Sequence, residues 1–126
     1  MKKKCPIEYT VSLISGKWKV GILKELSQGP VRYGTLVRAI PDISAKILIQ
    51  QLREMERDGL VVRKVFPEVP PKVEYALSSK GYSIFTIFIE LRRWGLEMEE
   101  ESVECLFCGK CQPYIVPEDK QPVQLS

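Results

Sequence analysis

The chain has 126 residues and a mass of 14.4 kDa, the size of one ordinary domain, and 28% of its residues are charged. It contains no histidine, which excludes a Ser-His-Asp triad, a Cys-His pair and any imidazole metal site built within the chain, so we expect no enzyme. Residues 1–77 hold 14 Lys/Arg against 8 Asp/Glu, whereas residues 78–126 hold 5 against 8, and a basic front part favours a polyanionic partner.

No export or membrane segment is expected. Glu8 interrupts the apolar region that a signal peptide would need after Lys2, Lys3 and Lys4. The longest apolar run, residues 82–89, is far shorter than the ~20 residues of a spanning helix. We therefore expect a cytoplasmic protein without membrane contact, whose four cysteines are thiols or metal ligands rather than structural disulfides.

Apolar residues at helical spacing predict four helices in the first half of the chain. They span residues 7–14, 17–27, 33–40 and 44–58. Ser44 is a favourable N-cap for the fourth helix, and Gly59 suits a left-handed residue at its end.

The pattern then changes to the period of β-strands. Residues 60–66 are rich in β-branched side chains, and apolar and polar residues alternate over 73–77. The proline-rich segment 67–72 joins them, which predicts a hairpin. Ser78 or Ser79 caps a last helix over 79–100, and we expect two parts: a folded domain, residues 1–101, and a Cys-rich tail, residues 102–126.

The fourth helix has one apolar and one polar face. Its apolar stripe consists of Ala45, Leu48, Leu52 and Met55, and the opposite stripe of Lys46, Gln50, Arg53 and Arg57, with Gln51 near the edge. Lys and Arg pair with guanine or phosphate, and Gln pairs with adenine, so the polar stripe suits DNA in the major groove. On a lone helix such a stripe would more often be a plain solvated face.

The neighbouring elements favour the DNA-binding interpretation of this stripe over a plain solvated face. A short helix and the turn 41–43 precede the fourth helix, and a hairpin carrying Arg63, Lys64 and Lys72 follows it. The predicted fold class is therefore mainly α with a β-hairpin wing, a winged helix-turn-helix.

Five segments also resemble the HxlR-type family of bacterial regulators, in the broader MarR-like group. They are CPIEY (residues 5–9), GKWK (16–19), LIQQLREME (48–56), DGLV (58–61) and PEVPPKVEYAL (67–77). The resemblance covers about residues 5–96 and implies a sequence-specific transcriptional regulator. It also implies a homodimer, built by the first and last helices, on a palindromic double-stranded DNA operator.

The last helix supports dimerisation independently. Its apolar residues cover a wide arc, more than one small domain needs for its own packing. They are Ile84, Ile87, Phe88, Leu91, Trp94, Gly95 and Met98, with Phe85, Ile89 and Leu96 outside the arc. The alternative is that this helix is the central core helix.

The predicted DNA contacts fall into three groups. Ser44, Lys46, Gln50, Gln51 and Arg53 belong to the recognition helix; Arg63, Lys64 and Lys72 belong to the wing; Lys17 and Lys19 add phosphate contacts from the second helix. For Lys17 and Lys19 an equal alternative is that they only make the surface more soluble.

The cysteines leave several interpretations open. The resemblance implies that Cys5 is a sensing thiol, and the charges of Lys2 to Lys4 would favour its thiolate form. The alternative is that Cys5 only packs as a small, partly buried apolar residue. Cys105, Cys108 and Cys111 have a spacing that resembles a zinc knuckle, one ligand short of four, so Cys5 or a cysteine of the partner subunit would complete a zinc site. Redox chemistry, an iron–sulfur site and free thiols remain alternatives, and no cofactor is required.

Two other functions compete with DNA binding. One is a winged-helix module that binds protein, in which apolar or acidic residues would be expected in place of Lys46, Gln50 and Arg53. The other is a thiol or metal protein, including a thiol enzyme, in which DNA binding is secondary. The absence of histidine and of a glycine-rich cofactor loop disfavours the enzyme.

Overall fold

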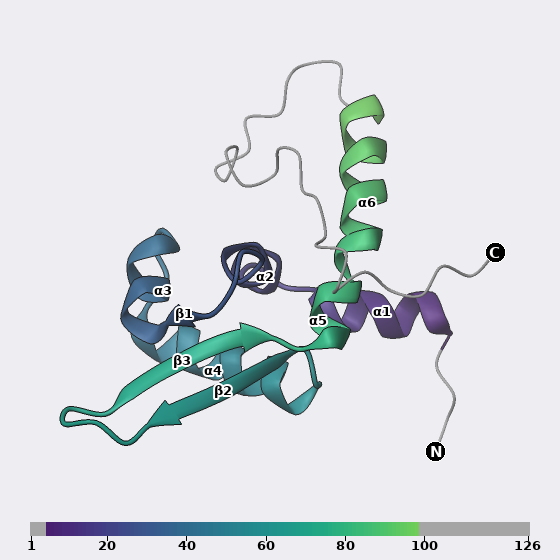
Figure 1. The fold of residues 1–126 in the computed structure, drawn as a ribbon. Helices are drawn as coiled ribbons and strands as arrows, with labels where there is room; N and C mark the ends of the chain where they lie inside the picture. Colours follow the sequence, from purple (N-terminus) through teal and green to yellow (C-terminus); the bar gives the residue numbers. More distant parts are fainter. Residues whose placement is uncertain (1–4, 99–126) are drawn as a thin grey trace.

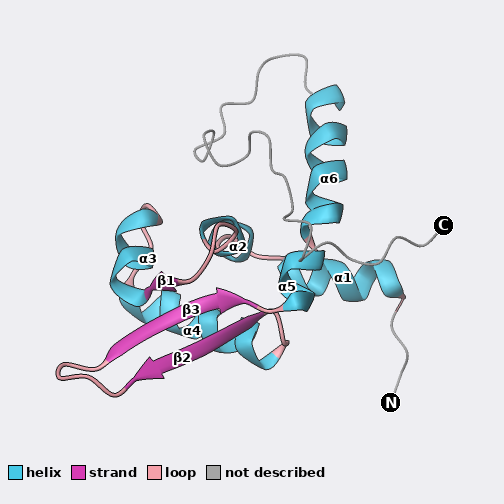
Figure 2. Cartoon of the chain, in the orientation of Figure 1, coloured by secondary structure: helices cyan, strands magenta, loops and turns pink. Residues whose placement is uncertain are grey.

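The computed structural model describes residues 5–98, in which helices pack on one face of a small antiparallel sheet (Figures 1 and 2). The elements are α1 (Pro6–Ile14), α2 (Lys19–Glu25), β1 (Val31–Arg32), α3 (Tyr33–Ala39), α4 (Ala45–Arg57), β2 (Val61–Phe66), β3 (Lys72–Leu77), α5 (Ser79–Ser83) and α6 (Phe85–Met98). The four helices and the hairpin of the first 77 residues are confirmed, with ends that shift by up to two residues. Within residues 5–98, no helix is long and apolar enough to cross a membrane.

The core lies between α2, α3, α4 and the inner face of the sheet. Leu48, Leu52 and Met55 of α4 are buried there, as their spacing predicts. Ala45 is exposed, so its assignment to the buried stripe is wrong. It is the first residue of α4 and lies at the edge of the stripe, where the helix emerges from the turn.

The turn between α3 and α4 is held at both ends. Ile40 and Ile43 are buried, and Asp42 between them adopts a left-handed conformation with φ 64°, which a short polar side chain tolerates. Ser44 is the N-cap of α4, because its Oγ accepts a hydrogen bond of 3.1 Å from the Ile47 N–H. At the other end Gly59 has φ 80°, as predicted for the residue that ends this helix.

The sheet has three strands in the order β1-β3-β2, all antiparallel. Tyr75 of β3 lies opposite Arg63 on one side and Val31 on the other, and Lys64 lies opposite Glu74. Val61, Tyr75 and Leu77 are buried. Because side chains alternate between the two faces of a sheet, every second residue of β2 and β3 therefore faces the helices, and the residues between them face solvent. The two-residue strand β1 is an addition to the predicted hairpin.

The predicted single helix over 79–100 is wrong, because the chain turns at Ile84 between α5 and α6. Ser78 caps α5 by accepting a hydrogen bond of 3.0 Å from the Gly81 N–H. Gly81 is needed there, since a Cβ atom would collide with the Leu60 carbonyl oxygen. Ile84 and Phe85 are buried and anchor the turn, after which α6 extends away from the body (Figure 1). The predicted tail, residues 102–126, lies outside the described residues.

Candidate nucleic-acid interface

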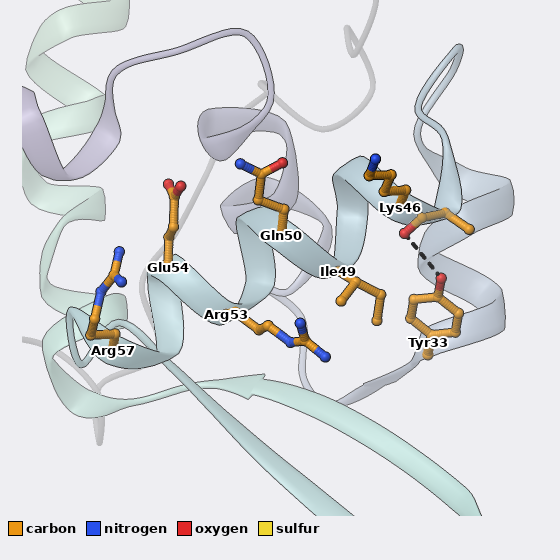
Figure 3. Close-up of a pocket in the computed structure, with 8 residues that line it drawn as sticks. Tyr33, Lys46, Ile49, Gln50, Arg53, Glu54 and Arg57 are labelled. Carbon is orange, nitrogen blue, oxygen red and sulfur yellow. Dashed lines mark hydrogen bonds between the residues drawn. The ribbon is translucent and has the colours of Figure 1, made fainter.

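The solvent-facing side of α4 carries the polar stripe that the sequence predicts. Lys46, Gln50, Arg53 and Arg57 are all exposed, and Figure 3 shows them along one open surface of the helix. This surface forms a hollow of about 590 Å³, lined also by Tyr33, Ala45, Ile49 and Glu54. The arrangement presents three cations and one amide together, which suits phosphates and base edges.

The start of this stripe is fixed by a contact with α3. The Tyr33 hydroxyl donates a hydrogen bond of 3.3 Å to the Ala45 carbonyl oxygen, which joins α3 to the start of α4 (Figure 3). Ser44 is exposed beside this bond while its Oγ caps the helix. Gln51 is half-buried, as its position at the edge of the stripe indicates.

Lys19 and Glu54 link α2 to α4. The Lys19 ammonium lies 3.0 Å from Glu54 Oε2, and the two side chains are only 11% and 31% exposed. The charge of Lys19 is therefore already paired within the protein, on the flank of the polar stripe. Lys17 is exposed, with its ammonium 4.7 Å from the centre of the Trp18 ring.

On the wing, two of the three predicted cations lie together. Lys64 and Lys72 place their ammonium groups 4.9 and 4.5 Å from the centre of the Phe66 ring, within cation–π range. Glu74 lies 3.1 Å from the Lys72 ammonium and pairs with it. Sequence reasoning missed Phe66 and Glu74, although the two-residue period of the strands and a correct hairpin register place all four on one face.

The third wing cation, Arg63, lies on the other face of the hairpin. It is opposite Tyr75 in the strand register and lines a second hollow together with Arg53 of α4. The structure thus divides the predicted wing set into a lysine pair on the outer face and an arginine beside α4.

Two helices away from the polar stripe of α4 carry exposed apolar side chains. On α6, Leu91 is 51% and Trp94 is 62% exposed, and Ile87, Leu96 and Met98 are exposed as well. On α1, Ile7 and Val11 are exposed. Phe85 is the buried residue of α6, so within residues 5–98 this helix is not the central core helix of its own domain. The apolar surface exceeds the isolated exposed residues normal for a monomer.

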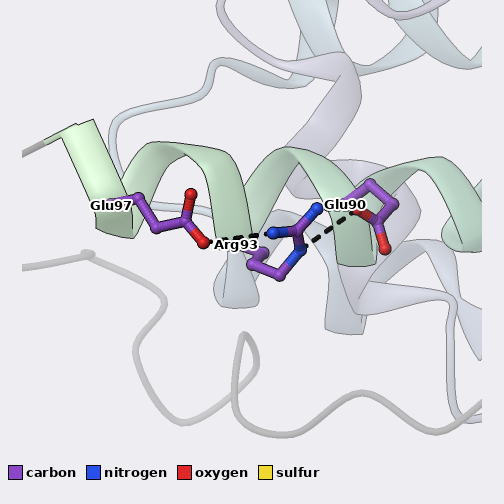
Figure 4. A network of polar contacts seen from close by, with 3 residues as sticks. All are labelled: Glu90, Arg93 and Glu97. Carbon is purple, nitrogen blue, oxygen red and sulfur yellow. Dashed lines mark hydrogen bonds and ion pairs between the residues drawn. The ribbon is translucent and has the colours of Figure 1, made fainter.

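One strip of α6 is polar. Arg93 donates to Glu90 Oε2 at 2.6 Å and to Glu97 Oε1 at 3.1 Å (Figure 4), and the bond to Glu90 in particular raises the pKa of Arg93. All three side chains are more than half exposed. This network keeps one side of α6 solvated and leaves the apolar side for another surface.

Cys5 is an exposed free thiol at the start of α1. The backbone N–H of Glu8, and to a smaller extent that of Ile7, lowers the pKa of the Cys5 thiol, although its side chain forms no capping hydrogen bond of good geometry. Within residues 5–98 there is no group of three possible metal ligands. Cys105, Cys108 and Cys111 lie outside the described residues.

Comparison with known proteins decides the family. The profile of the HxlR-like helix-turn-helix family matches residues 13–103. The chain belongs to the HxlR family. It is 50% identical over 96 residues to the uncharacterized HTH-type transcriptional regulator YkvN of Bacillus subtilis. The aligned region covers 75% of this chain and 81% of YkvN.

Two solved structures show the same fold. A MarR-family transcriptional regulator from Enterococcus faecalis V583 matches with a TM-score of 0.71 and 43% identity, covering 77% of this chain and 88% of that chain. The redox regulator HypR in its reduced form matches with a TM-score of 0.69 and 39% identity, covering 74% of this chain and 92% of that chain. This HxlR-family protein is therefore a helix-turn-helix transcriptional regulator rather than an enzyme, and the recognition of the family from the sequence is confirmed.

Proposed function

We propose that this HxlR-family regulator binds a palindromic operator as a homodimer, with α4 of each subunit in a major groove. The exposed stripe of Lys46, Gln50 and Arg53, adjacent to a basic hairpin, carries this proposal. A dimer suits it physically, because two half-sites about one helical turn apart multiply affinity and specificity.

Each part of the interface has its own role. Gln50 and Lys46 contact base edges near the start of α4, while Arg53 and the half-buried Gln51 contact bases or the flanking phosphates. Ser44 caps the helix and touches a phosphate from the same position.

The wing and α2 hold the DNA backbone. Lys64 and Lys72 lie together on the Phe66 ring, a geometry that supports two adjacent phosphate contacts when a phosphate replaces Glu74 at the Lys72 ammonium. Arg63 reaches the backbone from the side of the hairpin nearest α4. Lys17 adds a phosphate contact from the start of α2. We give Lys19 the different role of fixing α4 through Glu54, because its ammonium is largely buried and already paired.

Dimerisation uses α1 and α6. The exposed apolar side chains of both helices supply the surface, and the Glu90–Arg93–Glu97 network marks the side of α6 that stays in water. Because this regulator acts on chromosomal DNA in the proposal, we also place it in the cytoplasm.

The cysteines supply the signal in this proposal. The lowered pKa of Cys5 and its exposure support a redox-sensing thiol, and the similarity to the redox regulator HypR is in line with this role. For Cys105, Cys108 and Cys111 we propose a structural zinc site, with Cys5 or a cysteine of the partner subunit as the fourth ligand. Metal analysis of anaerobically purified, reduced protein tests it: absence of zinc and iron would contradict a metal site.

Selection of bound duplexes from a random pool tests the dimeric, palindromic mode. We expect enrichment of an inverted repeat whose half-sites are about 10 base pairs apart, centre to centre. Enrichment of a single half-site, or of no sequence, would contradict the proposed mode.

A further inference from the structure

The outer face of the sheet carries one carboxylate among three cations. Glu74 of β3 lies opposite Lys64 of β2 on one side and opposite Arg32 of β1 on the other. Its Oε2 lies 3.1 Å from the ammonium of Lys72, two residues earlier on the same strand. Residues that are directly opposite in antiparallel strands point to the same face, with their Cβ atoms about 5 Å apart. Arg32, Lys64, Lys72 and Glu74 therefore form one group, the outer-face cluster.

The ion pair within this cluster is partly sheltered from water. The side chains of Lys72 and Glu74 are each 22% exposed. The Phe66 ring lies opposite Lys72 in the register, and its centre is 4.5 Å from the Lys72 ammonium and 4.9 Å from that of Lys64. A ring that covers part of an ammonium group displaces water from it, so an anion on the remaining side interacts more strongly than it would in open solvent. In the free protein, Glu74 supplies this anion.

Glu74 does not balance the charge of the cluster. It is the only carboxylate in the three strands. Arg32 and Lys64 form no ion pair with any residue that the structure describes. Like charges on one face of a sheet repel each other, so an excess of cations does not stabilise the sheet. It suits a polyanion that approaches this face.

We propose that Glu74 is an internal substitute for a DNA phosphate, which occupies the Lys72 ammonium until the wing meets the DNA backbone. This inference rests on the proposed function, in which Lys64 and Lys72 contact that backbone. A phosphate oxygen displaces the Glu74 carboxylate, which then remains beside it as a like charge. Glu74 therefore lowers the affinity for every duplex alike and shortens the time that the protein stays on DNA outside its operator.

Removal of the charge should improve DNA binding. Glu74→Gln keeps the size of the side chain, and we expect it to bind a scrambled duplex about 3- to 10-fold more tightly than the wild type at low salt. The gain should shrink at physiological salt because ions screen the charge. Fluorescence anisotropy measures both affinities. Unchanged or weaker binding by Glu74→Gln would overturn the proposal.

Glu90→Gln is the matched control. It makes the same substitution at another ion-paired glutamate, on α6, and raises the net charge of the chain equally. It should leave the affinity for the scrambled duplex within about twofold of the wild type. An equal gain in both variants would show that the effect comes from net charge alone, which would contradict a specific role of Glu74.

A double-mutant cycle tests whether Glu74 acts through Lys72. In a Lys72→Gln background, Glu74→Gln frees no ammonium group, so its gain in affinity should fall to about twofold or less. A gain as large as in the wild-type background would show that Glu74 only repels DNA at a distance. That result would contradict competition for Lys72.

The stability of the protein should change in the opposite direction to its DNA affinity. Without Glu74, the three cations of the cluster repel one another in the free protein. We therefore expect Glu74→Gln to lower the midpoint of urea unfolding by about 0.2–0.5 M while DNA binding improves. An ion pair that only holds the sheet together would lower the midpoint alone, and that combination would overturn the proposal.

Pyrophosphate tests the cluster without DNA. We would titrate it into the full chain carrying ¹³C-labelled lysine and follow the Cε signals of Lys64 and Lys72 by NMR. Both signals should shift, and Glu74→Gln should bind pyrophosphate about 3- to 10-fold more tightly than the wild type. No shift in either protein, or equal affinity, would overturn the proposal. If the lysine signals responded as expected but no duplex were bound, the proposed function would fail while the competition at Lys72 would stand.

Discussion

Lys19 and Glu54 join α2 to α4, with the Lys19 ammonium 3.0 Å from Glu54 Oε2. Glu54 lies on the flank of the stripe that carries Lys46, Gln50 and Arg53. The ion pair therefore neutralises a carboxylate that would otherwise repel phosphates, and it ties α4 to α2.

Removal of Glu54 tests the structural importance of this pair. Glu54→Ala leaves a largely buried ammonium without its partner, so we expect the free energy of unfolding to fall by about 1–3 kcal/mol. Urea unfolding followed by circular dichroism measures it. Glu97→Ala in the exposed Arg93 network is the control and should cost less than about 1 kcal/mol. Equal losses in the two variants would contradict a special role for the buried pair.

Gln50 is expected to read sequence. Gln50→Ala should change the preference among operator variants at one position of each half-site, where loss of a base contact costs about 1–3 kcal/mol. Competition binding with a set of single-base operator variants measures the preference. Gln28→Ala, which alters an exposed glutamine outside α4, should leave the ranking unchanged. A Gln50→Ala protein that ranks all variants as the wild type does would show that Gln50 faces away from the bases.

Lys72 is expected to contribute affinity without specificity. Lys72→Gln should weaken binding to all duplexes alike. It should also reduce the slope of log Kd against the logarithm of the salt concentration by about one. Arg93→Gln makes the same change of charge on the polar side of α6 and should leave both quantities unaltered. If the loss in Lys72→Gln depended on the operator sequence, the wing would not act through the backbone.

The apolar surface of α6 is expected to hold the dimer. Leu91→Glu places a charge among Ile87, Trp94 and Met98, so the dimer should dissociate at micromolar concentration. Sedimentation velocity measures the species present. Glu90→Gln on the polar side of the same helix should remain dimeric. A Leu91→Glu protein with an unchanged sedimentation coefficient would exclude this face from the interface.

Cys5 is expected to react at lower pH than an ordinary thiol. The N–H groups of Glu8 and Ile7 favour the thiolate, so its pKa is lowered and the thiolate persists as pH falls below the usual thiol range. The alkylation rate of Cys5 against pH, read by peptide mass spectrometry, should have its midpoint below that of the same chain unfolded in denaturant. Coinciding midpoints would show that the fold does not activate this thiol.

Helix α4 could be predicted from the sequence because its signals are local. Ser44 caps α4, Gly59 ends it, and the apolar stripe of Leu48, Leu52 and Met55 is buried as its spacing requires. Periodicity also placed Gln50 on the exposed side.

Features that depend on tertiary contacts were not predictable in the same way. Strand β1 has two residues and exists through its pairing with Glu74 and Tyr75. The break at Ile84 follows from burial of Ile84 and Phe85 in the core, which redirects an otherwise continuous helical pattern. The pairing of Lys19 with Glu54 needs two helices to meet, and no spacing within either helix indicates it.

Sequence-specific DNA binding is tested most directly by a titration of reduced protein into a labelled duplex from upstream of its own gene, beside a scrambled duplex, at two salt concentrations. We expect binding to the upstream duplex about 10³-fold tighter than to the scrambled one, with both affinities falling as salt rises. Equal, weak binding to both duplexes would contradict sequence-specific recognition at this site. No binding to either duplex at low salt would contradict DNA recognition itself and favour a winged-helix module that binds protein.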